Sequence, residues 1–106
     1  MQTNLHLEGK KALITGGSRG LGLAIAKHFT ILGADIAFTY SKNDLDAEDA
    51  ADEIAALGKR PLVFKGSVSD STHVRDTVKT LIDQWGSIDI LVNNAGITQI
   101  LPIALI

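Results

Sequence analysis

Residues 15–22, Thr15-Gly16-Gly17-Ser18-Arg19-Gly20-Leu21-Gly22, form the stretch that decides the fold. A short apolar run at residues 11–15 precedes it, and apolar residues at helical spacing follow it. Gly16 can adopt backbone angles that a Cβ would forbid, Gly20 lets a ligand approach closely, and Gly22 lets helix and strand pack tightly. Because the amide groups at a helix start attract anions, the stretch predicts a strand–turn–helix unit that binds a phosphate.

The rest of the chain repeats this alternation of short apolar runs and helical patterns. We expect strands at residues 11–15, 34–40, 61–65 and 88–93, and helices at residues 20–32, 45–57 and from the capping residues 69–72 to Trp85. The connections are short, and crossovers between parallel strands are right-handed. The sequence therefore predicts an α/β fold, a Rossmann-type doubly wound parallel sheet with strand order 3-2-1-4.

Helical spacing also predicts which side chains pack inward. The expected inner positions are Leu21, Ala24, Ile25, Phe29 and Leu32 in the first helix, Ala47, Ala50, Ala51, Ile54 and Leu57 in the second, and Val74, Val78, Leu81, Ile82 and Trp85 in the third. We expect Trp85 in the core and not in a ligand platform. The acidic residues Asp46, Glu48, Asp49, Asp52 and Glu53 are expected on a solvated outer face and not at a metal site.

Composition and charge exclude several classes of protein. The 106 residues are 45% hydrophobic and 21% charged, which is typical of a single globular domain. A net charge of −2 argues against a general nucleic-acid or anionic-membrane surface. The chain has no cysteine and neither a signal peptide nor a membrane-span pattern, so we expect a cytoplasmic protein. His6, His28 and His73 lack metal-ligand spacing, and we expect them to be hydrogen-bonded or solvated, with no metal bound.

Polar or glycine-containing segments follow all four expected strands. The glycine turn follows the first strand, Tyr40-Ser41-Lys42 the second, Ser67-Val68 the third, and Asn93-Asn94-Ala95-Gly96 the fourth. The carboxyl ends of parallel strands meet at one edge of the sheet. A dinucleotide across this edge would place its pyrophosphate at the first segment and its adenosine at the second and third.

Two of these segments carry a family resemblance. The pattern Thr-Gly-x-x-x-Gly-x-Gly at residues 15–22, together with Asn-Asn-Ala-Gly at residues 93–96, resembles the short-chain dehydrogenase/reductase family. The resemblance covers the chain from about Leu7 onward, and within the family it is greatest to 3-oxoacyl-[acyl-carrier-protein] reductases and related carbonyl reductases. It implies that residues 1–106 form the N-terminal portion of a single NAD(P)-binding Rossmann domain.

The resemblance also implies roles for individual residues. Those expected to hold the pyrophosphate and adenosine ribose are Gly16, Ser18, Arg19, Gly20, Leu21 and Gly22. Asn94, Ala95 and Gly96 are expected along the middle of the dinucleotide, near the adenine ribose. Thr15 and Asn93 are expected to join neighbouring strands by hydrogen bonds.

The charge after the second strand predicts the choice of cofactor. NAD enzymes usually place an acid there to accept from the ribose 2′-hydroxyl. In this chain Tyr40 holds that position, and no acid follows until Asp44. Arg19, Ser41 and Lys42 instead offer positive charge and a hydroxyl to a 2′-phosphate, so we expect NADP(H) in preference to NAD(H).

The third segment departs from the family pattern. Many relatives have an acid or asparagine at the position of Ser67, where the side chain accepts from the adenine amino group. Ser67 has a shorter reach. Adenine recognition there is therefore expected to be weaker, or to depend on the backbone and on packing against Val68.

The resemblance implies hydride transfer between nicotinamide and a ketone or secondary alcohol, such as a 3-oxoacyl thioester. Family members use a Tyr-x-x-x-Lys pair with an upstream serine, but the single tyrosine, Tyr40, is followed four residues later by Asp44. No catalytic residue can therefore be named. We expect the catalytic residues beyond Ile106, in the remainder of a longer chain that forms a homo-oligomer.

Two alternatives remain open at this stage. One is an NADP(H)-binding module or truncated pseudoenzyme without turnover. The other is an interaction protein whose Rossmann half pairs with another chain.

Overall fold

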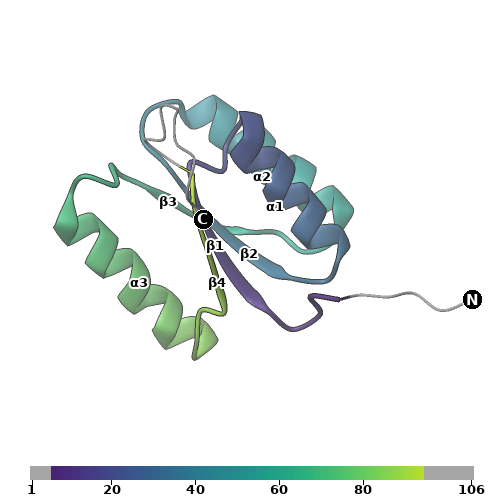
Figure 1. Cartoon of the computed structure of the whole chain (residues 1–106). Coiled ribbons are helices and arrows are strands. Elements are labelled where there is room, and N and C mark those ends of the chain that lie inside the picture. Colours follow the sequence, from purple (N-terminus) through teal and green to yellow (C-terminus); the bar gives the residue numbers. More distant parts are fainter. Residues whose placement is uncertain (1–5, 95–106) are drawn as a thin grey trace, which may run out of the picture.

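The structure, a computed structural model, describes residues 6–94. Figure 1 shows a sheet with helices on both faces. The elements in chain order are β1 (Lys11–Thr15), α1 (Gly20–Ile31), β2 (Asp35–Tyr40), α2 (Asp44–Leu57), β3 (Leu62–Lys65), α3 (Ser71–Trp85) and β4 (Ile90–Asn93). Their bounds lie within two residues of those predicted from the sequence.

The described strands form one parallel sheet in the order β3-β2-β1-β4. This confirms the predicted fold class and strand order. The register places Thr15, the last residue of β1, beside Thr39 of β2 and Asn93 of β4. The segments that follow β1, β2 and β4 therefore begin at one edge of the sheet.

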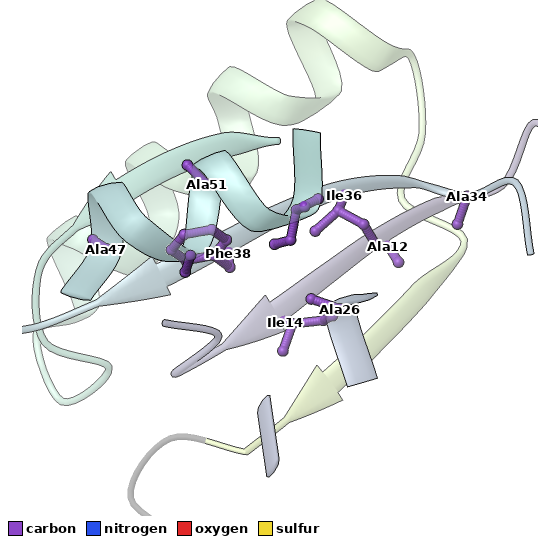
Figure 2. Packing of buried hydrophobic residues seen from close by; sticks show 10 residues of the cluster. Ala12, Ile14, Ala26, Ala34, Ile36, Phe38, Ala47 and Ala51 are labelled. Carbon is purple, nitrogen blue, oxygen red and sulfur yellow. The ribbon is translucent and has the colours of Figure 1, made fainter. Parts of the chain in front are cut away.

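The larger part of the core lies between the sheet and the pair α1 and α2, which cover the same face (Figure 1). Figure 2 shows Phe38 of β2 pointing toward α2, where Ala47 and Ala51 lie, and Ile14 of β1 close to Ala26 of α1. Phe38 and Ile14 are fully buried. Because the helix residues facing the sheet are mostly alanine, α1 and α2 can lie close to the large side chains of the strands.

The inner face of α1 differs from the prediction. Its buried residues are Gly22, Ala26 and Thr30, whereas Leu21 is 68% exposed and Ala24 is also exposed. The Thr30 hydroxyl donates to the carbonyl oxygen of Ala26 at 2.8 Å, so its burial leaves no unpaired polar group. Ile25 and Phe29 pack against the core as predicted, but the positions of α1 that are fully buried carry small side chains.

On the other face of the sheet lies α3 (Figure 1). Its Leu81 forms a second buried cluster with Leu13 of β1 and Ala37 of β2. Trp85 packs against this cluster, as predicted. The prediction was wrong for Val74, Val78 and Ile82, which are 37–42% exposed, because only the Thr77–Leu81 side of α3 faces the sheet.

Leu57 was also expected inside and is 41% exposed, because it is the last residue of α2 and lies beyond the buried positions of that helix. Within residues 6–94, no helix has both the length and the apolar character that a membrane span requires.

Candidate functional site

The glycine turn after β1 is tied to the end of β2. Gly16 has a φ of 70°, a conformation that side chains rarely adopt. The backbone N–H groups of Gly16 and Gly17 both donate to the carbonyl oxygen of Thr39, at 3.0 and 3.1 Å. These bonds hold the turn directly beside the segment that follows β2.

Asn94 fixes the same turn from the other side. Its side-chain amide donates to the Gly16 carbonyl oxygen at 3.2 Å, and its backbone N–H donates to the Thr15 hydroxyl at 2.9 Å. A Cβ at Gly22 would collide with that carbonyl oxygen and with the Asn94 amide nitrogen. The Thr15 hydroxyl donates to the Asn93 side-chain oxygen at 3.3 Å, which confirms that these two residues join β1 and β4.

The N-terminus of α1 has no side-chain cap, and we call it the open start of α1. Its N-cap residue is Arg19, whose backbone is extended and whose side chain makes no capping hydrogen bond, and the first turn contains no acid. The Leu23 N–H donates to the Arg19 carbonyl oxygen, so the amides of the three preceding residues have no acceptor one turn back in the helix. Gly20 has a φ of 60°, and an added Cβ there would meet nothing within 4 Å.

A cavity of about 530 Å³ lies beside this helix start, and we call it the carboxyl-edge cavity. Its lining combines the segments that follow β1, β2 and β3. The predicted site residues that line it are Gly16, Ser18, Arg19, Tyr40, Ser41, Lys42, Ser67 and Val68. Three segments far apart in the sequence therefore form one concave surface.

The other predicted site residues do not line this cavity. Gly20 and Gly22 lie in the first turn of α1, Leu21 points into solvent, and Asn94 is engaged with the turn. Ala95 and Gly96 lie outside the described residues.

Sequence reasoning missed four residues that line the cavity: Thr39, Asn43, Asp46 and Gly66. Thr39 and Gly66 are sequence neighbours of the predicted site residues Tyr40 and Ser67. Their place at the ends of β2 and β3 could therefore have predicted them. Asp46 was assigned to the outer face of the second helix. That assignment was wrong because the first turn of α2 begins at the same edge of the sheet.

The cations around the cavity differ in how they are paired. Arg19 Nη1 lies 3.4 Å from Asp46 Oδ2, with the Arg19 side chain 79% exposed. Lys42 lines the cavity and makes no ion pair within residues 6–94. An anion in the cavity would therefore meet one uncommitted cation and one held by an exposed ion pair.

The Asp44 carboxylate already interacts with two side chains. The Tyr40 hydroxyl donates to its Oδ1 at 2.7 Å, and Lys65 Nζ lies 2.9 Å from the same oxygen. The hydrogen bond with Asp44 raises the pKa of Tyr40, and hydrogen bonds from Tyr40 and Lys65 lower the pKa of Asp44. Contact with Asp44 also raises the pKa of Lys65. The acid nearest to Tyr40 in the sequence is thus ionised and already partnered.

His73 departs from the expectation that the histidines are hydrogen-bonded or solvated. Its Nε2 is buried and has no hydrogen-bond partner among the described residues. The ring lies against Gly66, where a Cβ would collide with it. Because Gly66 has no side chain, the ring can cover the backbone that ends β3. His6 and His28 are exposed.

Comparison with known proteins gives a consistent result. A family model described as short chain dehydrogenase matches residues 10–106. The chain belongs to this family. Its curated relatives include an L-rhamnose 1-dehydrogenase (NAD(P)(+)) from a Sphingomonas species, 42% identical over 91 residues that cover 86% of this chain and 36% of the relative. The 3-oxoacyl-[acyl-carrier-protein] reductase FabG of Staphylococcus aureus is 40% identical over 85% of this chain and 37% of its own.

The solved structures agree on the fold. A short chain dehydrogenase from Burkholderia cenocepacia, solved in complex with NADP, has a TM-score of 0.80 and 46% identity, and the match covers 88% of this chain and 38% of that one. The short-chain dehydrogenase resemblance inferred from the two sequence motifs is therefore confirmed. This chain spans somewhat more than a third of the length of these relatives.

Proposed function

We propose that the chain supplies the dinucleotide-binding part of an NADP(H)-dependent oxidoreductase. The complete protein would transfer a hydride between the nicotinamide and a ketone or secondary alcohol, with a 3-oxoacyl thioester as one candidate substrate. In this proposal residues 1–106 are the N-terminal portion of a single Rossmann domain.

The observation that carries the proposal is the junction of the open start of α1 with the carboxyl-edge cavity. A pyrophosphate suits the helix start, where the first amides have no helical acceptor and the first turn of α1 contains no acid. The cavity beside it has the size and mixed polar and apolar lining that an adenosine requires. The group therefore fits the residues that are present.

Each predicted residue has a role in this proposal. The pyrophosphate and its ribose would contact Gly16, Ser18, Arg19, Gly20, Leu21 and Gly22. Ser67 and Val68 would border the adenine, while Asn94, Ala95 and Gly96 would lie toward the middle of the dinucleotide. Asn94 would act partly by holding the Gly16 carbonyl, because its amide is already bonded there.

The preference for NADP(H) rests on the charges after β2. Tyr40, Ser41, Lys42 and Arg19 border the cavity where a ribose 2′-substituent would lie, and Asp44 is partnered by Tyr40 and Lys65. A 2′-phosphate carries about two negative charges and would gain charge-assisted hydrogen bonds from these cations. The relative from Burkholderia binds NADP, and the name of the rhamnose dehydrogenase allows both cofactors.

Arg19→Ala combined with Lys42→Ala tests this preference. The double variant should weaken NADPH binding by roughly tenfold or more, because hydrogen bonds to charged groups are lost, while NADH binding changes only a few-fold. Isothermal calorimetry on the full chain measures both constants. Equal losses for the two nucleotides would refute the NADP(H) assignment, and no heat from either nucleotide with the unaltered protein would refute the function.

A second candidate is an NADP(H)-binding module without turnover. Within residues 1–106 the single tyrosine, Tyr40, is bonded to Asp44 beside the carboxyl-edge cavity and has no lysine four residues later, so this part of the protein offers binding features without a Tyr-x-x-x-Lys pair. Binding of NADPH without its oxidation in the presence of simple ketones would support this candidate for the chain as given. A cytoplasmic location and a homo-oligomeric state stay predictions.

A further inference from the structure

The cavity lining includes a carboxylate, that of Asp46, paired with Arg19. Asp46 lies in the first turn of α2, where its backbone N–H is capped by the Asn43 side chain at 3.0 Å. Its own side chain lines the cavity, and Oδ2 accepts from Arg19 Nη1 at 3.4 Å. The ion pair therefore links the glycine turn to the start of α2.

This pair is weak enough to exchange partners. The Arg19 side chain is 79% exposed and that of Asp46 is 35% exposed, so water screens their attraction. A phosphate offers a guanidinium two parallel hydrogen bonds and a higher charge than one carboxylate. An arriving phosphate would therefore displace Asp46 from Arg19.

From this geometry we infer that Asp46 sets the strength of the preference for a 2′-phosphorylated nucleotide by competing with that phosphate for Arg19. The inference rests on the proposed function and extends it to a specificity-determining residue that lies on a different element from the expected phosphate contacts. A nucleotide without the 2′-phosphate has no need to displace the carboxylate. Asp46 thus lowers NADP(H) affinity while leaving NAD(H) affinity almost unchanged.

The neighbouring acids do not share this position. Asp44 is held by Tyr40 and Lys65 and does not line the cavity. Asp49, one turn further along α2, is exposed and does not line it either. Asp49→Asn is therefore a matched control, because it removes the same charge from the same helix without altering the partner of Arg19.

The test compares adenosine 2′,5′-bisphosphate with AMP, which differ only in the 2′-phosphate. Calorimetry would be run on the full chain for the unaltered protein, Asp46→Asn and Asp49→Asn. Asp46→Asn should tighten bisphosphate binding by roughly three- to tenfold, the range expected for releasing Arg19 from an exposed ion pair. AMP binding should change less than about twofold, and Asp49→Asn should match the unaltered protein in both titrations.

The Arg19→Ala background separates competition from simple charge repulsion. If Asp46 acts through Arg19, adding Asp46→Asn to Arg19→Ala should give less than about a twofold gain in bisphosphate affinity, because no guanidinium remains to be released. A gain of full size in that background would overturn the inference, and so would an unchanged ratio of bisphosphate to AMP affinity in Asp46→Asn. Failure of the unaltered protein to bind either probe would refute the proposed function itself. Thermal unfolding of each variant would verify that the affinities come from folded protein.

Discussion

Two cavities at opposite edges of the sheet differ in what their charged groups do. The carboxyl-edge cavity is about 530 Å³ and includes Lys42, which has no ion-pair partner within residues 6–94. The second cavity, about 220 Å³, lies where β2 and β3 begin, and we call it the amino-edge cavity. Its lining residues are Asp35, Ile36, Lys59, Arg60, Leu62, Gln84 and Trp85.

At the amino edge every cation that lines the cavity has an acidic partner. Asp35 forms ion pairs with Lys11 and with Lys59, the latter at 3.5 Å, and Arg60 pairs with Asp52 at 3.0 Å. At the carboxyl edge, by contrast, Lys42 has no acidic partner among the described residues and is available to a ligand. The carboxyl edge is therefore the candidate binding site, and the amino edge carries no comparable indication.

The helix starts show the same contrast. The Asn43 side chain caps α2 by accepting from the Asp46 N–H, and the Asp70 side chain caps α3 by accepting from the N–H groups of Thr72 and His73. Arg19 leaves α1 uncapped. Of the described helices, α1 alone lacks a side-chain cap at its start.

Gly22→Ala should disrupt the packing at the carboxyl edge and give the largest effect on stability and nucleotide binding. The new methyl group would collide with the Gly16 carbonyl oxygen and the Asn94 amide, so the turn and α1 must separate. We expect the free energy of unfolding to fall by about 2–3 kcal/mol, as in other overpacked sites, with loss of nucleotide binding. Urea unfolding and calorimetry measure the two effects.

Gly20→Ala is the control for this substitution. It adds a methyl group in open space and should cost only about 1 kcal/mol of backbone strain at a positive φ. Equal stability of the Gly22→Ala variant and the unaltered protein would contradict the close packing described for the turn.

Asp35→Asn should remove the ion pairs of Asp35 at the amino edge without altering the carboxyl edge. Burial by itself would raise the pKa of Asp35, but the hydrogen bond and charge of Lys11, together with Lys59, outweigh it and hold the pKa below the ordinary value of 3.8. The substitution should cost about 1 kcal/mol at neutral pH, a modest value because the site is partly solvated. Nucleotide affinity should not change.

The pH dependence of this variant checks the cause. A lowered pKa in the folded state contributes stability above the unfolded value of 3.8, and this contribution is lost as the pH falls below that value. The stability difference between the unaltered protein and Asp35→Asn should therefore shrink as the pH falls from 5 toward about 2. A difference that stays constant over this range would contradict an ionic role for Asp35.

The smallest effect should come from giving α1 the kind of cap that α2 has. Arg19→Asn and Arg19→Ala both remove the guanidinium, but only asparagine can accept from the first-turn amides. We expect the asparagine variant to be more stable by about 0.5–1 kcal/mol and to bind AMP more weakly than the alanine variant. Chemical unfolding and calorimetry give both values. Tighter binding by the asparagine variant would argue that the helix start does not hold the anion.

Much of the fold followed from local patterns. Short apolar runs and capping residues predicted the strand and helix bounds, and right-handed connections then predicted the strand order. The interior of α1 was predicted only in part: Ile25 and Phe29 pack against the core, but Leu21 and Ala24 are exposed, and the fully buried residues are Gly22, Ala26 and Thr30. Where a helix must approach a sheet closely, residue size overrides hydrophobicity.

The sequence alone determined the glycine turn, the segments gathered at one sheet edge and the family, because these depend on residues close together in the chain and on strand order. Tertiary structure decided which charges meet: Asp46 with Arg19, Asp44 with Tyr40 and Lys65, and the Asn94 amide with Gly16. The reason is geometric. Each residue turns a helix by about 100°, so a one-residue change in where α2 begins would direct Asp46 away from the cavity. Only the packing of α2 on the sheet fixes that rotation.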